Sequence, residues 1–264
     1  MPVVRSRARR SRVVTRTRQN EKFEEYPMPT SLAGQRVVII GGSSGLGLAT
    51  AALAREHGAT VTIAGRSEDK LREASAALGE ADTASVDISD ESSVAALFAP
   101  YDHIDHLIIT AGTLGPSGVT QQDLPTLQSV LEQRLWGAIY AVRAAAPKMT
   151  AGGSITLTSG GIAARPRAGA AMISVALAAV EALAPALALE LAPVRVNCIT
   201  PGVVLTPLQG SGPEAEARVA ERGKTLPVGR AGNVDDLAQA YLMAMTNGYL
   251  TGEVLHIDGG GRWL

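Results

Sequence analysis

Three glycines at a fixed spacing follow directly on an apolar run that ends at Ile40. Glycine has no Cβ, so a turn built from it lets the backbone approach a bound ligand closely. The stretch after this turn has the composition of a helix, and the first N–H groups of a helix attract an anion. Strand, glycine turn and helix in this order predict a site for the phosphates of a dinucleotide. The residues expected there are Gly41, Ser43, Ser44, Gly45, Leu46 and Gly47.

The second apolar run ends in Gly65-Arg66-Ser67 and indicates which dinucleotide is bound. In this arrangement an acid at the end of the second strand binds the adenosine ribose 2′-OH, whereas a basic residue accommodates a 2′-phosphate. Arg66 can pair with a phosphate through two N–H groups, and Ser67 is a further donor. The sequence therefore favours NADP(H) over NAD(H). The alternative is that Arg66 is a solvated loop charge and the site is indifferent.

Seven short β-rich runs alternate with Ala- and Leu-rich helical stretches from residue 36 onward. This alternation is typical of repeated βαβ units, whose parallel sheet is covered by helices on both faces. It predicts an α/β fold: a doubly wound Rossmann-type sheet of about seven strands in three α/β/α layers. The predicted strands are Arg36–Ile40, Thr60–Ala64, Thr83–Val86, His106–Thr110, Ser154–Thr158, Val194–Ile199 and Val254–Ile257. The predicted helices cover about 46–57, 67–78, 91–99, 123–149, 168–192, 213–223 and 234–246.

Length and charge limit the class of protein. The chain has 264 residues and a net charge of −1, which fits one α/β domain and argues against nucleic acid as a partner. The only cysteine, Cys198, excludes an internal disulfide, so we expect a reducing, cytoplasmic location. The four histidines lack neighbours at metal-ligand spacing, and no metal site is expected.

Charge is unevenly placed along the chain. Residues 1–27 hold eight basic and three acidic side chains, which leaves 16 basic and 22 acidic in the remainder. We predict that 1–27 is a disordered Arg-rich extension and that 28–264 forms a single dinucleotide-binding domain. A transit segment or a polyanion-binding arm is the alternative for 1–27.

The stretch from Ala168 to Ala192 is nearly all apolar, but Glu181, Pro185 and Glu190 interrupt it. Its abundant alanine suits a helix that packs closely against protein. We therefore predict a buried or subunit-interface helix here and no membrane span.

The spacing Gly-x-x-x-Gly-x-Gly and several later segments resemble the short-chain dehydrogenase/reductase superfamily, over about residues 32 to 261. Asp87-Ile88 is similar to the pair that holds the adenine ring, and Thr110-Ala111-Gly112 to the end of the family's Asn-Asn-Ala-Gly strand. Pro201–Pro207 resembles the loop that holds the nicotinamide carboxamide, and Thr251–Gly260 the last strand. The resemblance implies cofactor contacts from Asp87, Ile88, Ala111, Gly112, Pro201, Gly202, Val203 and Thr206.

The same resemblance places the catalytic residues. The family uses a Ser and a Tyr-x-x-x-Lys pair, in which the Tyr transfers a proton and the Lys lowers its pKa. Ser159 is similar to the family's Ser, but Ile173 and Leu177 stand at the Tyr and Lys positions. No Tyr occurs between residues 140 and 241 and no Lys between 148 and 224, so no shift of register restores the pair. Arg134 stands at the position of the family's relay Asn.

The resemblance implies an atypical NADP(H)-binding oxidoreductase for a small carbonyl or alcohol substrate. Ser159 would act as a donor and Arg134 as a fixed cation near the reacting oxygen. The structural alternatives are a strand-end cap for Ser159 and an interhelical or interface salt bridge for Arg134. Two other functions stay open: a nucleotide-binding sensor or scaffold without redox chemistry, and a lyase or isomerase that reuses the pocket.

The resemblance also implies what the protein binds besides the cofactor. Arg165 and Arg167 lie in the loop that borders the family's substrate pocket, where they could attract an acidic substrate or be solvated charges. The Ala-rich helices predicted at 123–149 and 168–192 are those that the family uses to pair subunits, so a homodimer or homotetramer is expected.

Overall fold

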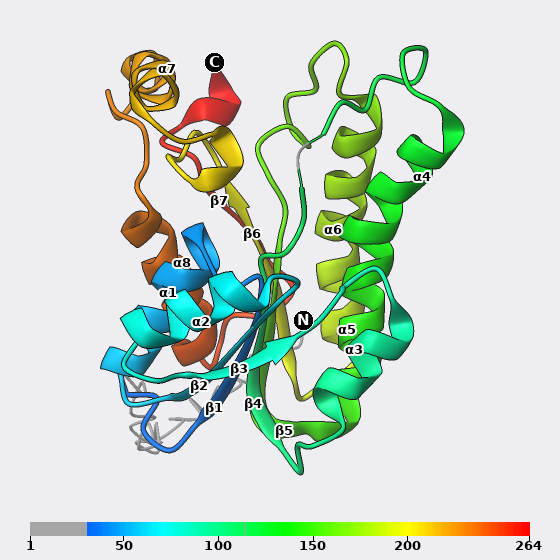
Figure 1. Cartoon of the computed structure of the whole chain (residues 1–264), viewed down its shortest axis with the longest axis vertical. Helices are drawn as coiled ribbons and strands as arrows, with labels where there is room; N and C mark the ends of the chain where they lie inside the picture. Colours follow the sequence, from blue (N-terminus) through cyan, green and yellow to red (C-terminus); the bar gives the residue numbers. More distant parts are fainter. Residues whose placement is uncertain (1–30, 114) are drawn as a thin grey trace, which may run out of the picture.

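The computed structural model describes residues 31–113 and 115–264, and the expectations for residues 1–27 lie outside the described residues. Its centre is a parallel sheet of seven strands in the order β3-β2-β1-β4-β5-β6-β7 (Figure 1). This confirms the predicted fold class. The strands are β1 (Arg36–Ile40), β2 (Thr60–Gly65), β3 (Asp82–Ser85), β4 (Ile104–Ile109), β5 (Met149–Thr158), β6 (Arg195–Pro201) and β7 (Val254–Ile257).

Helices cover both faces of the sheet, which appear as the left and right layers in Figure 1. One face carries α1 (Gly45–Glu56), α2 (Glu68–Ala77) and α8 (Val234–Thr246), and the other α3 (Glu91–Phe98), α5 (Gly137–Ala145) and α6 (Ala171–Glu190). Side chains of a strand alternate between faces. In β1, Val37 and Ile39 therefore pack in one core and Val38 and Ile40 in the other. This is why the strand reads as continuously apolar.

The direction of strand addition reverses between β1 and β4. The chain continues from β1 to β2 on one side, while β4 pairs with β1 on the other. In doubly wound sheets a crevice opens at this switch point, beyond the carboxyl ends of the strands. The helix α7 (Pro213–Lys224) lies beyond the same edge, beside the C-terminal segment (Figure 1).

The prediction of one continuous helix at 123–149 is wrong. The structure divides it into α4 (Leu124–Leu131), a π-helix η1 (Glu132–Trp136), α5 and a 3₁₀ turn η2 (Ala146–Lys148). A π-helix bonds residue i to i+5 and occurs mostly as a short segment within α-helices, often at functional sites. Apolar periodicity reports only that a segment is helical, so it does not reveal this change of winding.

The apolar stretch at 168–192 forms α6, the one helix of the described residues that is long and apolar enough to span a membrane by length and composition. Its sheet-facing side is buried and contributes Val180, Ala184 and Leu187 to the core with β5 and β6. Val175 and Leu189 lie on its exposed surface.

Candidate functional site

Two cavities lie at the carboxyl edge of the sheet and share wall residues. We name the first, of about 340 Å³, the glycine-turn cavity, because the turn after β1 lines it. We name the second, of about 480 Å³, the arginine cavity, because five arginines line it. Leu46, Thr110, Thr206 and Leu208 line both, so the two form one continuous site.

The turn between β1 and α1 is closed by backbone contact. A Cβ on Gly47 would lie 2.2 Å from the carbonyl oxygen of Gly41, and Gly41 itself has φ +94°. Both positions therefore require glycine. Thr110 at the end of β4 supports the turn, since its hydroxyl donates to the carbonyl oxygens of Ile40 and Gly41 at 3.3 and 3.2 Å.

The N-terminus of α1 faces this cavity without a capping side chain. Ser44 at the N-cap makes no side-chain hydrogen bond to the helix, and the first turn carries no acid. The free N–H groups and the positive end of the helix dipole are suited to a phosphate. The uncapped helix and the glycine cradle together fit a dinucleotide.

Two cations lie at the β2–α2 side of this cavity. Arg66, at the end of β2, and Lys70, one helical turn later in α2, both line the glycine-turn cavity. Ser67 does not line it, because its hydroxyl caps α2 by accepting from the N–H of Lys70 at 3.4 Å. The structure thus places Ser67 at the N-cap of α2, outside the residues that line the cavity.

Asp87 follows β3 in the same wall. Its carboxylate accepts from the hydroxyl and the N–H of Ser89 at 2.6 and 3.0 Å. These hydrogen bonds, with a smaller effect of the Arg66 charge, lower the pKa of Asp87. The carboxylate is therefore ionised at neutral pH and held in one orientation.

The structure brings the other expected cofactor residues together. Those at the glycine-turn cavity are Gly41, Ser43, Ser44, Gly45, Leu46, Gly47, Arg66, Asp87, Ile88, Ala111, Gly112 and Thr206. Those at the arginine cavity are Pro201, Gly202, Val203 and again Thr206. The nucleotide half and the nicotinamide half expected from the sequence thus lie in the two adjoining parts of one site.

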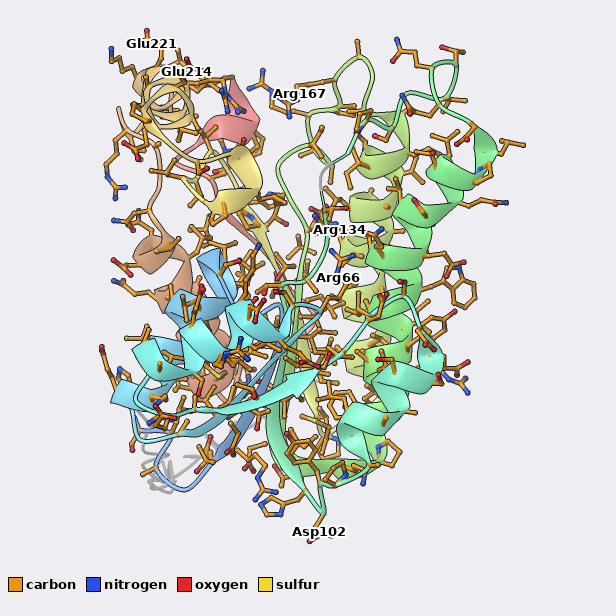
Figure 2. The ribbon with its side chains drawn as sticks, in the orientation of Figure 1. Arg66, Asp102, Arg134, Arg167, Glu214 and Glu221 are labelled. Carbon is orange, nitrogen blue, oxygen red and sulfur yellow. The ribbon has the colours of Figure 1, made fainter. Side chains whose placement is uncertain are left out.

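Arg134 lies in the π-helix η1 and lines the arginine cavity (Figure 2). Its residue is only 7% exposed, its Nη2 donates to the carbonyl oxygen of Thr113 at 3.0 Å, and its Nε has no partner. Burial lowers the pKa of Arg134 to about 10, so the group remains a cation at neutral pH. Within the described residues it forms no ion pair, so the intrachain salt bridge considered for it is absent there.

Gly112 makes room for this guanidinium. A Cβ at Gly112 would lie 2.3 Å from Arg134 Nε, so the arginine packs directly on the backbone after β4. Any larger residue at this position would displace the cation. The glycine expected from the resemblance as a cofactor contact thus has a second role here.

Ser159 is positioned by the carboxylate of Glu181. Its Oγ lies 2.8 Å from Glu181 Oε1 and 3.2 Å from the carbonyl oxygen of Leu177. The same Oε1 accepts from Thr200 Oγ1 at 2.9 Å, which ties α6 to the ends of β5 and β6. Ser159 also lines the arginine cavity, with Glu181 behind it. The hydroxyl joins two elements and does not cap its own strand.

No tyrosine, lysine or histidine lines the arginine cavity within the described part of the chain. Leu177 forms part of its wall, while Ile173 is buried one turn earlier on α6 and does not reach it. Tyr241 lies behind the wall and bonds Thr158 Oγ1 through its hydroxyl at 2.6 Å. Burial raises the pKa of Tyr241, and the residue does not line the cavity, so its hydroxyl is not placed to act as a general acid there.

A doubly wound sheet with a glycine turn at its switch point defines a dinucleotide-binding Rossmann domain. The chain belongs to the short-chain dehydrogenase/reductase family. Residues 41–261 match the family model described as Enoyl-(Acyl carrier protein) reductase. Members of the family use a nicotinamide cofactor.

Relatives align along most of their length. The short-chain dehydrogenase/reductase ATR9 of Stachybotrys chlorohalonatus is 34% identical over 250 residues, covering 88% of this chain and 98% of that protein. The structure of the MalC reductase/Diels-Alderase of Malbranchea aurantiaca has a TM-score of 0.83 at 32% identity, covering 90% of this chain and 99% of that one. A crystal structure of a small-chain dehydrogenase in complex with NADPH has a TM-score of 0.75 at 34% identity, covering 87% and 99%.

Two residues of the site, Lys70 and Glu181, are not predicted from the sequence. Lys70 is one of many charged residues of an exposed helix, and only its spacing of four from Arg66 places it on the same side. Glu181 interrupts an apolar helix, which is a signal for a buried polar contact, but its partners come from distant strands.

Proposed function

We propose that this protein is an NADP(H)-dependent oxidoreductase for a small carbonyl or alcohol substrate, with Ser159 and Arg134 in place of the family's Tyr and Lys. The observation that carries this proposal is that the buried cation Arg134 and the hydroxyl of Ser159 line one cavity, which adjoins the glycine-turn cavity. A cation fixed at the wall of a buried cavity can stabilise negative charge that develops on a bound substrate oxygen.

The proposed roles follow from these positions. A bound reduced nicotinamide would supply the hydride that reduces a carbonyl carbon. Arg134 would hold the carbonyl oxygen and stabilise the negative charge that develops on it. Ser159 would pass its proton to that oxygen and regain one from solvent water in the cavity, while Glu181, which accepts from Ser159 Oγ at 2.8 Å, would hold the hydroxyl in place.

The preference for NADP(H) is supported by Arg66 and Lys70 in the glycine-turn cavity and by the absence of an acid at the tip of β2. Titrating the purified protein with NADPH and with NADH, followed by nicotinamide fluorescence, tests it. We expect tight binding with a clear preference for NADPH. Failure to bind either nucleotide would contradict the proposed cofactor.

Turnover is tested by following NADPH consumption with a panel of small aldehydes and ketones. We expect slow reduction by the parent protein, and Ser159→Ala to lower kcat/KM by roughly 10²-fold because the proton donor is lost. Ser174→Ala is the matched control: this buried serine donates to the carbonyl oxygen of Ala170 and does not line either cavity. Equal losses in both variants would point to a general structural effect.

The second candidate is a nucleotide-binding protein without redox chemistry. The buried Ile173 and Leu177 favour it, since apolar side chains occupy the positions that the resemblance gives to the acid–base pair. It predicts NADPH binding without turnover of any carbonyl in the panel. A lyase or isomerase stays a third possibility; one similar structure is described as a reductase/Diels-Alderase.

We also propose a homodimer or homotetramer, paired through the outer surfaces of η1 and α6. Trp136, Val175 and Leu189 are large apolar side chains exposed on these helices. Sedimentation velocity of the full chain tests this, with Leu189→Glu expected to weaken association. A monomer at micromolar concentration would contradict it.

A further inference from the structure

The lining of the arginine cavity has an unbalanced charge. Its charged members are five arginines and a single acid, Asp258. The residues after position 27 carry 16 basic and 22 acidic side chains, so this excess of cations opposes the average of the chain. The arginines of the lining are Arg134, Arg165, Arg167, Arg222 and Arg262.

The one acid does not neutralise them. Asp258 accepts from the backbone N–H groups of Gly260 and Arg262, both at 2.9 Å, and so stabilises the turn after β7. The ion pairs of the described residues join other side chains: Arg72 with Asp69, Lys224 with Glu221, and Arg230 with Asp236. The cations of the cavity therefore have no carboxylate partner in this part of the chain.

The five arginines differ in the contacts that their side chains make within the described residues. Arg165 donates to the carbonyl oxygen of Gly261 at 2.8 Å and Arg262 lies 4.6 Å from the centre of the Trp263 ring. Within residues 31–113 and 115–264, the guanidinium groups of Arg167 and Arg222 make no hydrogen bond or ion pair. They come from the loop before α6 and from α7, two segments that border the same cavity.

The acids of α7, Glu214, Glu216 and Glu221, are not among the residues that line the arginine cavity. Figure 2 shows Glu214 and Glu221 at α7 and Arg167 at the neighbouring loop before α6. Burial, and then the charges of Arg167 and Arg218, lower the pKa of Arg222. The guanidinium groups of Arg222 and Arg167 thus repel one another, and an anion bound between them would offset this repulsion.

We propose that the arginine cavity binds a substrate carrying a carboxylate or phosphate group, held by Arg167 and Arg222 at the cavity's outer end. This inference rests on the proposed function for its inner end, where the carbonyl would meet Ser159 and Arg134. Guanidinium groups bind carboxylate and phosphate oxygens through paired N–H donors, which suits both anions. The substrate class is therefore an anionic carbonyl compound or the corresponding hydroxy acid or phosphate.

Calorimetric titration with matched probes tests this. The probes are para-formylbenzoate, para-formylphenyl phosphate and the neutral para-formylbenzamide, each added to the full-length protein with and without saturating NADP⁺. We expect the better anion to bind about 10- to 100-fold more tightly than the amide, the range of one or two charged hydrogen bonds. The comparison of benzoate with phosphate identifies which anion the site prefers.

The double variant Arg167→Gln/Arg222→Gln should remove this preference and leave amide binding unchanged. Arg218→Gln is the matched control, because Arg218 lies on the same helix, outside the cavity lining, and donates to the carbonyl oxygen of Gln209. Unchanged NADPH binding shows that the double variant is folded, since neither residue lines the glycine-turn cavity.

Equal affinity for anionic and neutral probes in the parent would overturn the proposal, and so would a preference that survives in the double variant. Binding is measured without turnover, which separates this result from the proposed function. A protein that binds para-formylbenzoate but never consumes NADPH would retain the anion site and lose the redox role.

Discussion

The glycine-turn cavity and the arginine cavity adjoin, yet they are built in different ways. The phosphate end of the first consists of backbone groups of the turn between β1 and α1, supported by Thr110, and the segments after β2, β3 and β4 line the rest. The second collects side chains from η1, β5, α6, α7 and the segment after β7. Among them, Arg134 and Ser159 are each oriented by a hydrogen bond to a distant part of the chain, Thr113 and Glu181 respectively.

This difference indicates that cofactor binding and catalysis can change independently. Phosphate binding by a helix N-terminus depends on backbone N–H groups, which most substitutions leave in place. Acid–base catalysis depends on single side chains, so replacing two of them removes it without disturbing the fold. In this protein the glycine turn resembles the family's pattern, whereas Ile173 and Leu177 stand at the positions that the resemblance gives to Tyr and Lys, and a buried Arg134 lines the arginine cavity.

The largest expected effect sharpens this contrast. Arg134→Gln should lower kcat/KM for carbonyl reduction by about 10²- to 10³-fold, the cost of removing a preorganised charge from the reacting oxygen. NADPH affinity should change little, since Arg134 does not line the glycine-turn cavity. Steady-state kinetics and fluorescence titration measure the two quantities. Arg143→Gln, an exposed arginine in the last turn of α5, serves as the control; comparable losses in both variants would refute the role of Arg134.

A restoration variant tests whether the catalytic half is still arranged for hydride transfer. Ile173→Tyr with Leu177→Lys should raise reduction by roughly 10²-fold, because a general acid with a tuned pKa is worth that or more. Ile173→Phe with Leu177→Met fills a similar volume without the acid and is the matched control. The comparison of turnover rates at equal NADPH occupancy is decisive. If both double variants reduce carbonyls no faster than the parent while the cofactor still binds, the result supports a nucleotide-binding protein without redox chemistry.

A smaller effect is expected on cofactor affinity, from changes confined to the glycine-turn cavity. Arg66→Gln with Lys70→Gln should weaken NADPH binding by about 10- to 100-fold, through the loss of charged hydrogen bonds to the 2′-phosphate, and leave NADH binding unchanged. Arg72→Gln is the control, since Arg72 pairs with Asp69 on the same helix and does not line the cavity. An equal loss of affinity for NADPH and NADH would show that Arg66 and Lys70 do not bind the 2′-phosphate.

The smallest expected effect concerns Glu181. Glu181→Gln keeps a hydrogen-bond acceptor for Ser159 and Thr200 but removes the negative charge, so the loss in kcat should stay below the ~10² of a direct general acid. The steady-state kcat of the variant beside that of the parent measures this. A loss of about 10²-fold or more would contradict a role of Glu181 in positioning alone.

The sequence by itself determined the sheet, the glycine turn and the chemistry that is missing. These features depend on local patterns: apolar periodicity gives the elements, and the order of strand, turn and helix gives the phosphate site. β1 and β7 have the predicted bounds, and the cofactor residues other than Ser67 line the predicted site. The absence of a Tyr and a Lys near residues 173–177 can be read directly from the chain.

Only the tertiary structure decided which side chains meet in the arginine cavity. A π-turn in the middle of a predicted helix buries Arg134 against Gly112, and no periodicity signals it. Glu181 contacts Ser159 and Thr200 because β5 and β6 end beside α6, and Arg167 and Arg222 line one cavity although 55 positions separate them. Such contacts depend on how elements distant in the sequence pack together, and local residue patterns contain no information on that packing.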